Sequence, residues 1–149
     1  MRKETITYTD YNGDTRTEDF YFNLSKAEVL ELEMSWDGGL KNFLEKIIKE
    51  QDQKRIIEMF KMLVLKAYGE RSLDGKKFMK VDEDGRSLAQ KNFVPTEAYS
   101  ELFMKLATDE QAASDFVNGI VPKNLDDKAP KAIENKPAEV VPGPGADKK

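Results

Sequence analysis

Strand-forming residues on either side of a turn signal give the first part of the chain the pattern of a β-hairpin. Thr5–Tyr8 and Phe20–Phe22 favour strands, and Asn12-Gly13 between them is a strong hairpin-turn signal. The pattern predicts a hairpin over residues 3–22. Because a lone two-stranded hairpin is only marginally stable in water, we expect its aromatic face to pack on helices or on another subunit.

A helix is predicted to begin directly after the hairpin. Ser25 and Glu28 have the spacing of a capping box, and Leu24 and Val29 stand where a hydrophobic staple joins N′ to N4. The apolar residues between 30 and 36 alternate with the period of a strand instead. We favour a helix because the cap is specific and the two glutamates within that stretch are poor strand residues.

Apolar residues at helical spacing predict two further helices. The first, about Leu40–Gln51, has apolar residues on one stripe. The second, about Gln53–Tyr68, is apolar around most of its circumference, which indicates burial on several sides. We therefore expect the second helix to be the central element of the core. Core packing is favoured over a surface groove for its large side chains, including Phe60.

The region 69–94 has the least regular pattern. Turns are predicted at Leu73–Lys76 and Asp82–Gly85, a short strand over Lys77–Val81 and a brief helix over Ser87–Phe93. The acidic run at 82–84 lacks the following oxygen donors of a calcium loop, so a solvated turn is favoured over a metal site.

Two compact helices close the body between Thr96 and Pro122. Thr96 is the expected N-cap of the first helix and Thr108 that of the last, and Gly119 with Pro122 marks the end of the last helix.

From residue 123 the chain is rich in proline and poor in large apolar residues, so it cannot bury enough surface to offset the entropy of ordering. We predict one domain over 1–122 and a disordered tail over 123–149. The predicted fold class is α+β and predominantly α, with an N-terminal β-hairpin followed by a bundle of about five helices.

Composition narrows the function classes. The chain has no Cys, which excludes disulfides and Cys-ligated zinc, and no His, the most frequent general base and nitrogen ligand. We therefore expect no enzyme, cofactor or metal. The net charge of −4 argues against a nucleic-acid surface. No run reaches the roughly 18 apolar residues of a membrane span, so no membrane partner is expected.

Flexible methionines and the single tryptophan are the candidate contacts for a protein partner. Thioether side chains suit surfaces that accept varied apolar partners, and Trp is enriched at interface hot spots. Packing in the core is the alternative for each of them. The candidate partner-binding residues are Met34, Trp36, Phe43, Met62 and Met104.

Several segments, in order, resemble the bacteriophage tail assembly chaperone family of the siphophage type. They are Phe20–Glu28, Gly38-Gly39-Leu40, Tyr68–Ser72 and Thr96–Pro122. The resemblance implies a protein of the host cytoplasm that binds and solubilises the tape measure protein and helps recruit subunits of the major tail tube protein. It also implies absence from the finished virion, and self-association is left open. The alternative is a minor virion structural protein or a head–tail adaptor.

Overall fold

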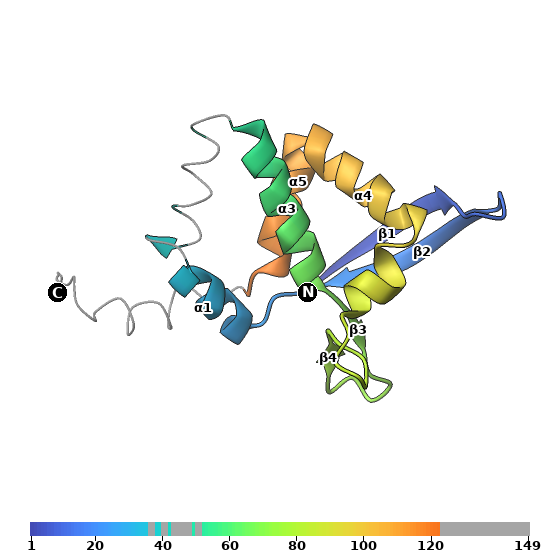
Figure 1. Cartoon of the computed structure of the whole chain (residues 1–149), viewed down its shortest axis with the longest axis horizontal. Helices are drawn as coiled ribbons and strands as arrows, with labels where there is room; N and C mark the ends of the chain where they lie inside the picture. The colour runs from blue at the N-terminus through green and yellow to red at the C-terminus, as the bar shows by residue number, and fades with distance from the viewer. Residues whose placement is uncertain (36–37, 40–41, 43–48, 50–51, 123–149) are drawn as a thin grey trace.

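The computed structural model describes residues 1–35, 38–39, 42, 49 and 52–122 of the 149-residue chain. Its sheet starts with the predicted hairpin, formed by β1 (Arg2–Thr9) and β2 (Thr15–Phe22). Strand β2 pairs antiparallel with β3 (Tyr68–Arg71), and β3 pairs antiparallel with β4 (Phe78–Met79). The strand order is therefore β1-β2-β3-β4, and the tip of the hairpin extends beyond the helices (Figure 1). The Tyr11 hydroxyl in this turn donates to Glu97 Oε2 at 2.8 Å.

The expectation of a predominantly α fold is wrong, because the hairpin is extended into a four-stranded antiparallel sheet and the fold is mixed α+β. The extension begins where the central helix ends: Tyr68 pairs with Phe22, and Gly69 pairs with Tyr21. A Cβ at Gly69 would lie 2.5 Å from the Phe78 ring, so any other residue there would displace that ring. These pairings are long-range, so residues 68–71 carry no local strand signal.

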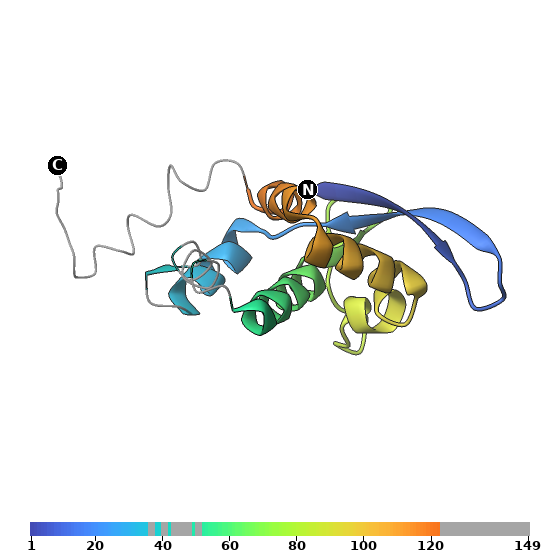
Figure 2. The same cartoon turned by 90° about the horizontal axis from the view of Figure 1, so that it is seen from above.

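The described helices are α1 (Lys26–Ser35), α3 (Gln53–Ala67), α4 (Glu97–Thr108) and α5 (Glu110–Ile120), with a π-helix, η1 (Ala89–Phe93). Helices α3 and α4 and the π-helix lie on one side of the hairpin (Figure 2). The predicted capping box is confirmed: Glu28 N–H donates to Ser25 Oγ, and Ser25 N–H donates to Glu28 Oε1. The helix predicted over about 40–51 and the predicted tail fall almost wholly outside the described residues.

The irregular region 69–94 is built from tight turns and short elements. The predicted turn at Asp82–Gly85 is confirmed, with Asp82 Oδ1 accepting from the N–H groups of Asp84 and Arg86. The strand predicted over Lys77–Val81 is shorter, since only β4 and an isolated bridge between Val81 and Ser87 form.

An aromatic cluster joins the sheet to the helices. Phe93 of η1 is fully buried, and its ring stacks on Tyr68 with centroids 5.0 Å apart. The same ring meets Phe22 of β2 edge-on at 5.6 Å, and Phe22 meets Phe116 of α5 at 5.3 Å. Contacts between aromatic rings add to the stabilisation that comes from burial, so this cluster is the centre of the core.

Lys80 ties the β3–β4 region to two helices. Its ammonium donates to the Glu28 carboxylate at 3.0 Å, to Lys66 O at 2.6 Å and to Asn23 O at 3.0 Å. Burial lowers the pKa of Lys80 and opposes the effect of Glu28. Burial would raise the pKa of Glu28, but the Ser25 N–H and the Lys80 ammonium outweigh it, and that pKa is lowered.

Candidate functional site

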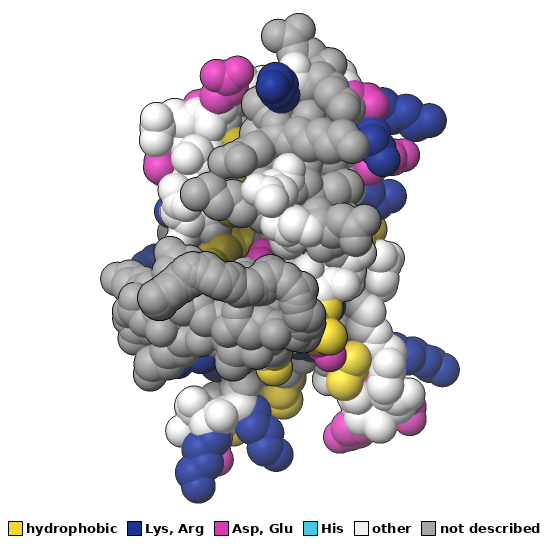
Figure 3. Space-filling view, turned by 90° about the vertical axis from the view of Figure 1, so that its left-hand side faces the viewer, with side chains coloured by type: hydrophobic (Ala, Val, Ile, Leu, Met, Phe, Trp, Pro, Cys, Tyr) yellow, Lys and Arg dark blue, Asp and Glu magenta, His cyan; other side chains and the backbone are white. Residues whose placement is uncertain are grey.

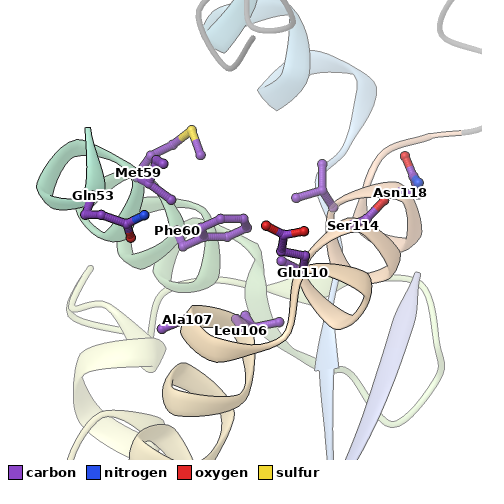
Figure 4. A pocket seen from close by; sticks show the side chains of 11 residues that line it. Gln53, Met59, Phe60, Leu106, Ala107, Glu110, Ser114 and Asn118 are labelled. Carbon is purple, nitrogen blue, oxygen red and sulfur yellow. The ribbon is translucent and has the colours of Figure 1, made fainter. Parts of the chain in front are cut away.

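A mainly apolar groove of about 450 Å³ lies between α3, α4 and α5 (Figure 4). Three helices contribute its walls, and polar side chains lie among the apolar ones. The lining residues are Gln53, Ile56, Met59 and Phe60 from α3, Leu106 and Ala107 from α4, and Glu110, Ala113, Ser114, Val117 and Asn118 from α5.

Capping aspartates fix the helix ends around this groove. Asp52 Oδ1 accepts from Arg55 N–H at the start of α3. Asp109 is both the C-cap of α4 and the N-cap of α5, and its carboxylate accepts from the backbone N–H groups of Gln111 and Ala112. Because one residue joins the two helices, the end of α4 and the start of α5 stay together on one side of the groove.

The prediction that Thr108 caps the last helix is therefore wrong. Thr108 is the last residue of α4, and its hydroxyl donates to Met104 O at 2.7 Å within that helix. The carboxylate of the next residue takes the capping position, where Asp and Thr are both common.

The groove residues differ in burial. Met59, Leu106 and Ala113 are buried, whereas Ile56, Phe60 and Val117 are partly buried and pack against the core. The expectation that Phe60 packs only in the core needs correction, because its partly buried side chain also lines the groove. Helical periodicity shows which residues share a face, but it does not show whether neighbouring elements close over that face.

Glu110 brings a negative charge to this apolar surface. Its carboxylate and the Phe60 ring point toward one another from α5 and α3 (Figure 4). In the described part of the chain the Glu110 side chain has no hydrogen bond or ion pair. An apolar groove with one unpaired carboxylate suits a segment that combines apolar side chains with a basic one.

Of the candidate partner-binding residues, the three that the structure describes do not line this groove. Met34 on α1 and Met104 on α4 are 67% and 60% exposed, and Met62 is partly buried against the core. Trp36 and Phe43 lie outside the described residues. Exposed hydrophobic side chains also lie between charged ones on the face in Figure 3. A binding role for Met34, Met62 and Met104 remains a prediction.

The sequence offered only a weak signal for the groove itself. Ile56 and Phe60 stand four residues apart on α3, as do Ala113 and Val117 on α5, so each pair shares a helix face. The same spacing is typical of residues that meet in a closed core, which is why the groove was not predicted.

Within residues 1–35, 38–39, 42, 49 and 52–122, no three His, Cys, Asp or Glu side chains are grouped so that they could hold a metal ion. The helices of this described part are all too short or too polar to cross a membrane.

A family model described as phage tail assembly chaperone matches residues 1–144, almost the full length of the chain. Searches of curated proteins and of solved structures give no match.

Proposed function

Because this chain belongs to the phage tail assembly chaperone family, we propose that it binds the tape measure protein during tail assembly, keeps it soluble and helps recruit tail tube subunits around it. The family is not a family of enzymes. The proposed chaperone works in the host cytoplasm and is absent from the mature virion. We expect its affinity to be modest, since it must leave as the tube polymerises.

The observation that carries the proposal is the groove between α3, α4 and α5. Long amphipathic helices expose apolar stripes to water until other subunits cover them, and this exposure drives aggregation. A groove with apolar walls can bury such a stripe in the helix-in-groove mode, with apolar residues of the client three and four positions apart. The α3 wall runs from Gln53 to Phe60, about 10 Å along the helix, so it accommodates about two turns of a client helix.

Glu110 refines the chemistry of the client. A carboxylate beside apolar walls favours a helix that carries Lys or Arg next to its apolar stripe and disfavours one with Asp or Glu there. The apolar contact supplies most of the affinity, so moderate salt should weaken the complex only slightly.

Co-expression with the tape measure protein tests the proposal. We expect the wild-type chain to move the tape measure protein from the pellet to the soluble fraction. Val117→Asp, which places a charge in the groove, should leave the client in the pellet. The matched control is Leu73→Asp, at a fully exposed turn position, which should behave as the wild type does.

Circular dichroism of both variants checks that they remain folded. If folded Val117→Asp solubilises the client as well as the control, the groove is not the binding site. If the chain is present stoichiometrically in purified mature virions, it is a structural protein of the particle instead of a chaperone.

A further inference from the structure

A row of polar side chains runs along the α5 side of the groove. Glu110, Ser114 and Asn118 stand four residues apart, so they lie on one face of the helix, each about one turn from the next (Figure 4). All three are exposed and line the groove. Eight residues of helix separate the first from the last, so this polar row is about 12 Å long.

The polar row has no partner within the described part of the chain. The side chains of Glu110, Ser114 and Asn118 make no hydrogen bond and no ion pair with residues 1–35, 38–39, 42, 49 and 52–122. The next row of α5 differs, because Gln111 Nε2 donates to Asp115 Oδ1 at 2.9 Å and neither residue lines the groove. The polar groups beside the groove are therefore left for water or for a ligand, whereas those of the next row bond to each other.

The other walls of the groove set the orientation of a bound helix about its own axis. Apart from Gln53, the residues that line the groove from α3 and α4 are all apolar. A bound helix has to turn its apolar stripe toward these walls, because a polar side chain buried against them would lose its hydrogen bonds to water. The residues beside that stripe then face the polar row.

We propose that the polar row sets the register of the client helix, and that the client carries a matching row of three polar residues four apart. Lys or Arg stands at one end of the client's row, and neutral hydrogen-bonding residues fill the other two positions. This inference rests on the proposed helix-in-groove function. Residues four apart form a ridge on a helix, so the two ridges lie side by side. The cation then meets Glu110, and the neutral residues exchange hydrogen bonds with Ser114 and Asn118.

The position of the charge at one end of the row is what discriminates between clients. A cation in the middle of the client's row meets Ser114 and leaves Glu110 opposite a neutral group. Sliding the client by one turn restores the contact between the cation and the carboxylate, but it moves one turn of the apolar stripe out of a groove that accommodates only about two turns. The position of the cation relative to the apolar stripe therefore fixes the register.

Synthetic peptides of identical composition test this inference. Each is a fluorescein-labelled helix of about 16 residues, with its apolar residues confined to two turns and a row of one Lys and two Gln beside them. The end peptides carry Lys at the first or at the last position of the row, so that both directions of the helix in the groove are covered. The centre peptide carries Lys in the middle.

Fluorescence anisotropy with the full chain measures the Kd of each peptide. We expect the tighter of the two end peptides to bind the wild type about three to ten times more tightly than the centre peptide. Folded Val117→Asp should bind none of them, which would locate the peptides in the groove.

Moving the carboxylate along the polar row should reverse the preference. The double variant Glu110→Ser with Ser114→Glu places the charge in the middle of the row and keeps the composition and the net charge, so the centre peptide should become the tighter ligand. The matched control exchanges the same kinds of group on the next row, Gln111→Asp with Asp115→Gln, and should keep the preference of the wild type. Circular dichroism checks that both double variants fold.

Equal affinities of the wild type for end and centre peptides, lost in Val117→Asp, would overturn the inference and leave helix binding in the groove intact. A preference that persists in the folded Glu110→Ser, Ser114→Glu variant would also overturn it. If the wild type binds no peptide, or if Val117→Asp binds them all as tightly, the inference and the proposed groove function fail together. The comparison of peptides on the wild type needs no variant, so it decides the question even if the double variant does not fold.

Discussion

Truncating Phe93 and Phe60 to alanine makes the same chemical change at two sites that the structure distinguishes. The Phe93 ring is fully buried, with its centroid 5.1 Å from that of Phe20 and 5.6 Å from those of Phe22 and Tyr99. Removing it leaves a closed cavity where the sheet meets the helices. Phe93→Ala should therefore cost about 4–5 kcal/mol in the free energy of unfolding, the upper part of the range for buried Phe.

Phe60→Ala should cost less. The Phe60 side chain is only partly buried, and it borders a groove that is open to water. Part of its surface is exposed before the mutation, and water or neighbouring side chains can enter the space that it leaves. The expected cost is about 1–3 kcal/mol, mainly from the apolar area that is no longer buried.

Urea denaturation followed by circular dichroism measures both free energies by linear extrapolation, provided that the slopes of the variants agree. We expect Phe93→Ala to be the more destabilising variant by about 2 kcal/mol. Equal costs at the upper value would mean that Phe60 is sealed inside the core, and the groove would then have no wall on the α3 side.

Three further predictions concern the caps, an ion pair and the tail. Asp109→Ala removes the cap of α5 and should cost about 1–2 kcal/mol in urea denaturation, whereas Asp109→Asn should cost little. Because the pKa of Glu28 is lowered, its ionised carboxylate stabilises the fold above the ordinary carboxyl pKa of 4.5, and this stabilisation is lost as the pH falls below that value. The difference in the free energy of unfolding between wild type and Glu28→Gln should therefore shrink on acidification. A difference that stays constant would contradict this. Deleting 123–149 should leave the melting temperature nearly unchanged, and a loss of several degrees would show that the tail packs on the body.

Local signals in the sequence predicted the local structure well. The hairpin rests on Asn12-Gly13, where Gly13 has a φ of 87° that favours glycine. The capping box of Ser25 and Glu28 identified α1 correctly against a competing strand pattern. In both cases the physical cause lies within a few residues of chain.

Long-range features were missed. Strand β3 exists because Tyr68 and Gly69 pair with β2, more than forty positions earlier, and nothing near residue 68 specifies that partner. The groove depends on how three helices are placed, so Phe60 and Val117 have the same sequence pattern whether they face a core or a groove. Met34 and Met104 are candidate partner contacts because their thioether side chains are flexible, and this property does not give their position in the fold.

Photo-crosslinking from the groove shows directly whether this surface holds the tape measure protein. A photoreactive amino acid replaces Ser114 in the groove, or Leu73 at the exposed turn as the control, in a chain co-expressed with the tape measure protein. We expect position 114 to crosslink to amphipathic helical segments of the tape measure protein and position 73 not to. Crosslinks from position 73 but none from position 114, in a complex that is soluble, would show that the client does not bind in the groove.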